Sequence, residues 1–154
     1  MRIILKTTIK RDFQTVVSGF NKELFEYLIG YYPLVKLRRY DGQEHGDMVH
    51  FNFGWSGTNE WKVVVKDSEL TSKNYWFIHR GLTMPFGLDF WQHMHRVVAL
   101  GKNKTAIIDY IQFESKWKWL NPLNFVFLYL VLFPQKLFYR RYYYGKFSPP
   151  GNSP

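Results

Sequence analysis

Hydrophobic and polar positions alternate over much of this chain, and the period changes near the N-terminus. Residues 2–10 alternate imperfectly, which predicts a first strand. After Asp12, a suitable helix N-cap, apolar residues recur at helical spacing up to Gly30, and Gly19 with Asn21 divides this stretch into two short helices. Alternation then resumes and predicts strands at 34–40, 49–55, 61–66 and 75–80, with polar loops at 56–59 and 67–74.

Segment 85–113 predicts a hairpin, because apolar, aromatic and β-branched residues flank a short polar turn at residues 101–104. A symmetric turn fixes which residues lie opposite each other, and opposite residues share a face of the sheet. The pairs predicted on one face are His95 with Tyr110 and His93 with Gln112.

The predicted hairpin face is unusually mixed in chemistry. Trp91, His93 and His95 are two residues apart, so they lie on the same face. The opposite face places Arg96 across from Asp109 as a candidate ion pair. A face that combines aromatic rings, imidazoles, a hydroxyl and an amide is typical of a pocket wall rather than of a dry core.

The C-terminal part of the chain predicts a long helix. Asn121 and Pro122 form a helix start, and residues 123–133 are almost all apolar, so this helix is expected to be enclosed. The apolar run is shorter than the roughly 20 residues that cross a bilayer, which favours a helix gripped by a curved sheet. Pro134 is expected to kink it. Residues 1–147 are interpreted as one domain and 148–154 as a disordered tail.

Composition limits the chemistry. Aromatic residues make up 20% of the chain, and large rings can wall a wide cavity. The chain has no cysteine, which excludes disulfides and thiolate ligands. The apolar run after Arg2 is too short for a secretory signal, so a cytoplasmic location is expected. A net charge of +9 is compatible with an anionic partner, which could be nucleic acid, an acidic ligand or an anionic membrane surface, but the preferred interpretation is that it keeps an aromatic-rich domain soluble. Without an RNA-binding motif, nucleic acid is disfavoured.

Several motifs resemble one branch of the SRPBCC superfamily, also called START-like. They are the run from Phe77 through Pro85-Phe86, the Trp91-x-His93-x-His95 strand, Ile108-Asp109, residues 34–42 and residues 138–141. The resemblance implies an α+β helix-grip fold, in which a curved antiparallel sheet wraps around a long C-terminal helix, with two short helices after the first strand. It also implies a cavity between sheet and helix that relatives use for apolar molecules. A shared fold does not fix one chemistry.

The expected function is non-catalytic binding of a hydrophobic or aromatic small molecule, or a lipid, in that cavity. Neutral imidazole both donates and accepts hydrogen bonds, which suits a hydroxyl or carbonyl on an apolar ligand. The predicted ligand-binding residues are His79, Trp91, His93, His95, Tyr110, Gln112, Phe51, Phe53, Trp61, Phe125, Leu128 and Tyr129.

Two other functions remain open. A cyclase, aromatase or dehydratase could use His95 as base and Tyr110 as acid in the same cavity. A peripheral lipid-transfer or membrane-surface protein could use its basic residues on anionic headgroups. His79, His93 and His95 could converge on a metal, but hydrogen bonding is the preferred interpretation, so neither a metal nor a cofactor is expected.

Overall fold

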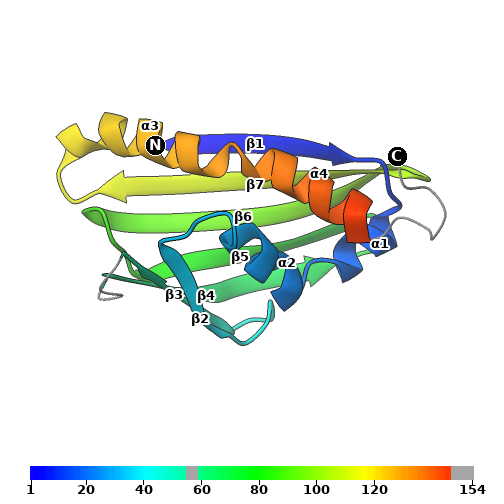
Figure 1. Cartoon of the computed structure of the whole chain (residues 1–154), viewed down its shortest axis with the longest axis horizontal. Coiled ribbons are helices and arrows are strands. Elements are labelled where there is room, and N and C mark those ends of the chain that lie inside the picture. Colours follow the sequence, from blue (N-terminus) through cyan, green and yellow to red (C-terminus); the bar gives the residue numbers. More distant parts are fainter. Residues whose placement is uncertain (55–58, 147–154) are drawn as a thin grey trace.

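Within the part of the chain that the structure describes, seven antiparallel strands form one sheet in the order β1-β7-β6-β5-β4-β3-β2 (Figure 1). The structure is a computed structural model that describes residues 1–54 and 59–146. Most of the loop predicted at 56–59 and the tail predicted at 148–154 lie outside the described residues. The strands are β1 (Arg2–Ile9), β2 (Val35–Tyr40), β3 (Met48–Phe53), β4 (Asn59–Leu70), β5 (Asn74–Thr83), β6 (Leu88–Gly101) and β7 (Lys104–Ser115).

Two short helices follow β1, as the helical spacing predicted: α1 (Phe13–Ser18) and α2 (Lys22–Ile29). The Asp12 side chain accepts a hydrogen bond from the backbone N–H of Thr15 at 2.9 Å. The Asn21 side chain caps α2 in the same way, accepting from the N–H of Leu24 at 3.2 Å. Each cap is worth about 1 kcal/mol, and together they fix where each helix begins.

Strand β4 is longer than predicted. Residues 67–70 were assigned to a polar loop, and that prediction is wrong, because Asp67 to Leu70 pair with Ile78 to Tyr75 on β5. These residues are largely exposed, so the alternation of burial that marks a strand is missing there. Backbone pairing extends the strand where the side-chain pattern gives no signal.

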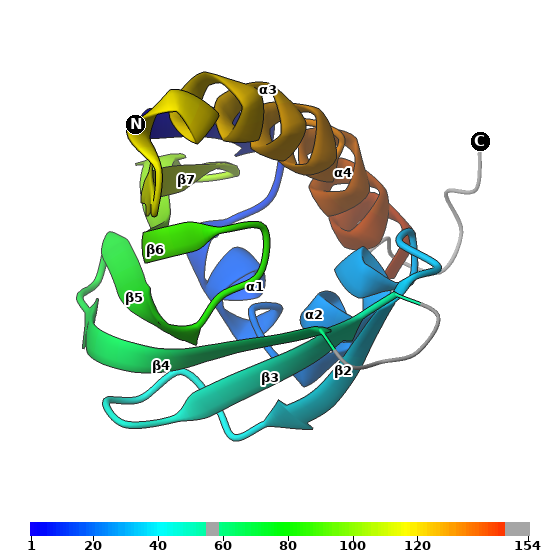
Figure 2. The same ribbon diagram turned by 90° about the vertical axis from the view of Figure 1, so that its left-hand side faces the viewer.

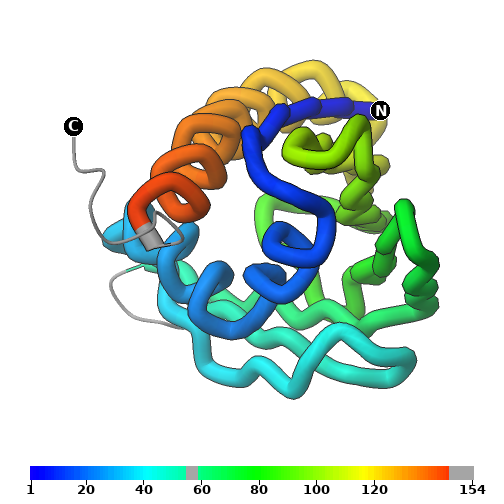
Figure 3. The backbone as a smooth tube through the Cα atoms, turned by 90° about the vertical axis from the view of Figure 1, so that its right-hand side faces the viewer, coloured from blue at the N-terminus to red at the C-terminus, as the bar shows by residue number. Residues whose placement is uncertain are grey.

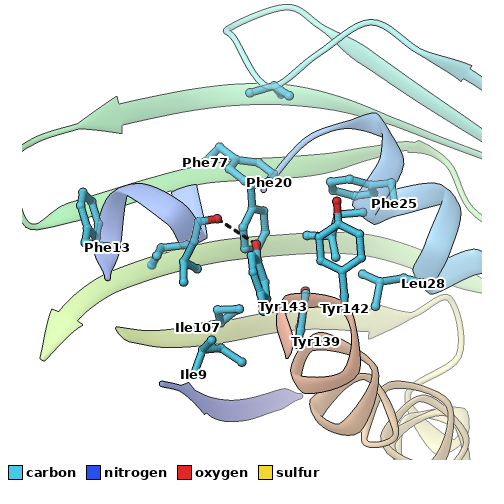
Figure 4. Close-up of a cluster of buried hydrophobic side chains, with 14 residues drawn as sticks. Ile9, Phe13, Phe20, Phe25, Leu28, Phe77, Ile107, Tyr139, Tyr142 and Tyr143 are labelled. Atoms are coloured by element: carbon cyan, nitrogen blue, oxygen red, sulfur yellow. Dashed lines mark hydrogen bonds between the residues drawn. The ribbon is translucent and has the colours of Figure 1, made fainter. Parts of the chain in front are cut away.

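Two helices end the described chain: α3 (Asn121–Leu132) and α4 (Gln135–Lys146), which follow the short 3₁₀ turn η1 (Lys118–Leu120). One long helix with a kink at Pro134 was predicted, and the structure instead ends α3 at Leu132 and begins α4 at Gln135, so the helix is interrupted at this proline. Helix α4 lies beside β1, with α2 near its far end (Figure 3). Its Tyr139 and Tyr143 are fully buried in the core, and the Tyr143 hydroxyl donates to the Val16 carbonyl at 2.8 Å (Figure 4).

Helix α3 is not enclosed, so that part of the prediction is wrong. It runs along the β1–β7 edge at the rim of the curved sheet (Figure 2), where only one of its faces meets other elements. Within α3 the buried side chains are Asn124, Leu128 and Leu132. Apolar residues such as Leu123 and Leu130 face away from the sheet and are exposed.

The register of the β6–β7 hairpin also differs from the symmetric one. The pairing shifts by one residue between Ala99 and Gly101, so His95 lies opposite Asp109 and Met94 lies opposite Tyr110. A one-residue shift moves a whole strand to the other face. Asp109 therefore joins the histidine face, and Tyr110 and Gln112 leave it. The predicted ion pair of Asp109 with Arg96 is wrong, since the Arg96 Nε donates to Asn74 Oδ1 at 2.7 Å.

Candidate functional site

A cavity of about 170 Å³ lies between the concave face of the sheet, helix α2 and the junction of α3 with α4. Its wall is mostly apolar and aromatic. The predicted residues that line it all come from strands: His79, Trp91, His93, His95, Phe51, Phe53 and Trp61. Their alternation in β3 to β6 had placed them on one face, and the curvature of the sheet brings that face around a common space.

The other predicted residues do not line the cavity. Tyr110 and Gln112 lie on the opposite face of β7, where the Gln112 amide donates to the Tyr110 hydroxyl at 3.3 Å. Helix residues Phe125, Leu128 and Tyr129 also lie outside the lining, because α3 meets the cavity only at its last turn.

Helix residues that the sequence interpretation missed complete the wall. They are Phe25, Leu28 and Ile29 from α2, Val131 and Leu132 from α3, and Gln135 and Tyr139 from α4. The all-apolar run of α3 gave no signal of its orientation. Tyr139 lies in a tyrosine-rich segment in which burial follows helical spacing, and that spacing could have identified it.

A buried polar cluster centres on Asp109, whose carboxylate is 1% exposed. His93 Nε2 lies 3.1 Å from its Oδ1 at hydrogen-bond geometry. His95 Nδ1 lies 2.8 Å from the same oxygen, in a geometry bent away from that of a linear hydrogen bond. The Tyr139 hydroxyl donates weakly to this oxygen at 3.4 Å. Three side chains of the cavity wall are thus held by one carboxylate behind them.

Burial and charge together set the protonation of this cluster. Burial, with the charges of His95 and His93, holds the pKa of His79 well below its usual value. Burial first, and the charge of His95 second, lower the pKa of His93 to about 4 against the pull of Asp109. Burial by itself would raise the pKa of Asp109, but the hydrogen bonds from His93 and His95 outweigh it and lower that pKa. Near neutral pH, neutral His93 therefore faces an ionised Asp109.

Besides His95 Nδ1, which faces Asp109, two buried polar atoms of the lining residues make no hydrogen bond among the described residues: His79 Nε2 and Trp61 Nε1. Such groups are rare in folded proteins, and each costs about 1–3 kcal/mol unless something bonds to it.

His93, His95 and Asp109 are the described residues with the donor set and spacing for a metal ion. Their ligand atoms lie within 4.8 Å of one another. Imidazole nitrogens with a carboxylate oxygen suit zinc and other transition metals. The sequence interpretation had considered His79 in place of Asp109. In the structure His93 Nε2 is hydrogen-bonded to Asp109, and His95 Nδ1 lies 2.8 Å from the same carboxylate oxygen.

Acidification is expected to destabilise the protein. The pKa of His93 is lowered from 6.5 to about 4, so between these values the unfolded chain binds a proton that the folded chain does not. The stability is fully present above the higher value and is lost as the pH falls through this window. His93 alone predicts a loss of about 2 kcal/mol near pH 5, measured by urea unfolding at two pH values.

The control for this pH dependence is the exposed His45. His93→Gln keeps a donor for Asp109 but cannot titrate, so it should reduce the loss of stability near pH 5 by the His93 share, whereas His45→Gln should leave the loss as in wild type. Equal profiles for wild type and His93→Gln would contradict the assignment.

The sheet, the two capped helices and the C-terminal helix pair define a helix-grip fold, with a cavity between the sheet and the helices. Solved structures with this fold match most of the chain. Norcoclaurine synthase from Thalictrum flavum gives a TM-score of 0.71 at 13% identity, covering 96% of this chain and 96% of that chain. A hypothetical protein from Helicobacter pylori gives 0.63 at 15% identity, covering 92% and 88%. A major latex-like protein from Panax ginseng gives 0.58 at 16% identity, covering 90% and 95%.

No protein-family model matches the chain, and no curated protein matches its sequence. At these identities the structural likeness establishes the architecture. The chain has the helix-grip fold, as the sequence resemblance predicted.

Proposed function

We propose that this protein binds a small aromatic or other apolar molecule in the cavity between the sheet and the C-terminal helices. The observation that carries the proposal is an apolar cavity whose lining residues include two polar atoms without a partner among the described residues, His79 Nε2 and Trp61 Nε1. Apolar walls supply affinity through burial, and a few polar atoms fix orientation. A hydroxyl or carbonyl group on the ligand bonds to these atoms.

The size of the cavity narrows the ligand class. An apolar cavity of about 150 Å³ accepts one benzene ring, and the cavity here is about 170 Å³. A single-ring compound with one polar substituent fits this space, whereas a whole diacyl lipid does not. Norcoclaurine synthase, which shares the fold, has been solved in complex with dopamine and hydroxybenzaldehyde. That precedent supports a small aromatic ligand.

Ligand retention is expected to require the free volume of the cavity. Val35 lines the cavity and is half-buried at the start of β2, so Val35→Trp should fill the space without removing a core contact. The neighbouring Leu34 is exposed and is not among the lining residues, so Leu34→Trp is the matched control. Native mass spectrometry should detect an apolar compound with wild type and with Leu34→Trp, and none with Val35→Trp.

A wild-type protein that retains nothing can still be tested with 4-hydroxybenzaldehyde as probe. Chemical-shift changes at His79 and Trp61 on its addition would support the site. Unchanged spectra at millimolar probe, or equal binding by Val35→Trp, would contradict the proposal.

Proton transfer in the same cavity is a second candidate, favoured by the buried contact of His95 with Asp109 beside Tyr139. Asp109 would orient His95 as a base toward a carbonyl compound. Burial raises the pKa of Tyr139 well above its usual value, so its hydroxyl stays protonated and can donate to the developing oxyanion. The earlier pair of His95 with Tyr110 is excluded by the register.

Hydrogen–deuterium exchange at the α-carbon of phenylacetone, followed by NMR in D₂O, tests this activity. Loss of exchange in His95→Ala with binding retained supports catalysis. Binding without exchange in wild type would restrict the function to binding.

A further inference from the structure

Helix α3 presents a continuous apolar face to solvent, here called the α3 face. It comprises Leu123, Val126, Phe127, Leu130 and Phe133, which recur three or four positions apart and therefore form one stripe. Leu123 and Leu130 are 64% and 66% exposed. Phe86, before β6, extends the stripe, because its ring lies 5.1 Å from that of Phe127. Soluble monomers rarely leave such a contiguous apolar surface uncovered without a partner for it.

The ends of the α3 face carry the residues that anchor proteins at a bilayer interface. Before α3, Trp117 and Trp119 are 56% and 73% exposed, and exposed Lys116 and Lys118 alternate with them. Tryptophan prefers the headgroup level, and lysine reaches anionic lipid with its ammonium group while its stem stays apolar. At the other end, the Lys136 ammonium lies over the Phe133 ring at 5.2 Å.

Charge complementarity identifies the partner chemistry. After Glu114 the sequence contains no acidic residue, and the basic residues that follow are Lys116, Lys118, Lys136, Arg140, Arg141 and Lys146. A protein partner for an apolar stripe needs no such one-sided charge. An anionic bilayer matches both the apolar stripe and the basic residues, because it has an apolar interior beneath a negatively charged surface.

We propose that the α3 face docks in the plane of an anionic lipid bilayer, with Trp117 and Trp119 at the headgroup level. The apolar stripe enters the acyl boundary, and the flanking lysines contact lipid phosphates or carboxylates. The helix lies along the surface rather than across the membrane.

Residues 118–145 are long and apolar enough to be a candidate membrane span by composition, with 22% of the window buried. The structure argues against spanning. Tyr139 and Tyr143 of α4 are fully buried in the domain core, so α4 cannot leave it. Helix α3 alone has 12 residues, which is about 18 Å, well short of the roughly 30 Å hydrocarbon core.

Docking in this orientation would place the ligand cavity next to the bilayer, an inference that rests on the proposed function. The last turn of α3 carries the exposed stripe on one side and the cavity-lining Val131 and Leu132 on another. The Tyr32 hydroxyl donates to the Val131 carbonyl at 2.5 Å, which ties this turn to the loop after α2. A docked protein therefore holds its cavity beside the bilayer, where small apolar aromatic molecules concentrate.

Vesicle co-sedimentation of the full chain tests the docking. Vesicles of phosphatidylcholine with phosphatidylglycerol should bind the wild type, and pure phosphatidylcholine should bind it weakly. Leu123→Glu/Leu130→Glu changes two exposed side chains, so the fold is retained while binding falls by ~tenfold or more. Leu70→Glu alters an equally exposed leucine at the end of β4 and should bind as wild type does.

Three outcomes would overturn the proposal: no binding to anionic vesicles at low salt, equal binding by Leu123→Glu/Leu130→Glu, or resistance of the bound protein to alkaline carbonate, which indicates spanning. Light scattering adds a fourth, since a wild-type dimer that the double variant loses would assign the α3 face to a second copy. Native mass spectrometry of the double variant separates the two proposals, because it reports cavity occupancy independently of docking.

Discussion

Replacing Asp109 with alanine is expected to remove about 3–5 kcal/mol from the free energy of unfolding, a large share of the 5–15 kcal/mol typical of a domain. The carboxylate is buried and serves His93, His95 and Tyr139 at once. Its removal leaves buried imidazole N–H groups without an acceptor and opens a space behind the cavity wall. The shift of the urea unfolding midpoint, at unchanged slope, measures the loss.

Asp109→Asn keeps one acceptor oxygen and is expected to be intermediate, which preserves the test if Asp109→Ala does not fold. Arg96→Gln is the control that discriminates between the two registers. In the symmetric register Arg96 would be the partner of Asp109, whereas in the structure it bonds to Asn74 at the surface. Destabilisation by Arg96→Gln as large as that by Asp109→Ala would contradict the observed register.

The fold was predictable because its elements are encoded locally. Alternation in β3 and β5 and helical spacing in α1 and α2 reflect burial of one face, and burial is what selects those positions. Asp12, Asn21 and Pro134 mark boundaries through their own hydrogen bonds or lack of an N–H group. The order of these elements then leaves few architectures open.

The site was only half predictable because it depends on register. The aromatic and histidine residues of β3 to β6 line the cavity whatever the pairing, since each strand carries its own alternation. The residues of β7 that face the cavity were predicted from their pairing with β6. The register shift between Ala99 and Gly101 therefore places Asp109, rather than Tyr110, on the histidine face. The sequence of β7 itself indicates the correct face. Ile107, Ile111 and Phe113 are an even number of residues from Asp109, so they lie on its face of the strand, and all three are fully buried.

The exposure of α3 was not predictable from its composition, because an apolar run has no polar face to orient it. Such a helix is expected to be enclosed when protein is its only apolar environment. Its position at the sheet edge leaves a stripe that protein does not cover. Agreement between sequence and fold elsewhere is the reason for proposing that this exception serves docking.

Replacing Tyr143 with alanine is expected to cost about 3–5 kcal/mol, comparable with the loss of Asp109. The Tyr143 side chain is fully buried where α4 meets α1, and its hydroxyl bonds to the Val16 carbonyl (Figure 4). Removing the ring leaves a cavity and frees the end of α4. Tyr143→Phe loses only the hydrogen bond and should cost about 1 kcal/mol. Urea unfolding of the three proteins measures both steps.

Gly19 provides a second test of the packing of Tyr143, because a Cβ atom at this position would lie 2.6 Å from the Tyr143 ring. Gly19→Ala should therefore destabilise the protein by about 1–3 kcal/mol through overpacking. In Tyr143→Ala the clash is absent, so the double variant should be more stable than the sum of the single losses implies. Gly145→Ala is the control, since a Cβ there meets nothing within 4 Å. Strict additivity of Gly19→Ala and Tyr143→Ala would mean that α4 does not pack against α1 through this ring.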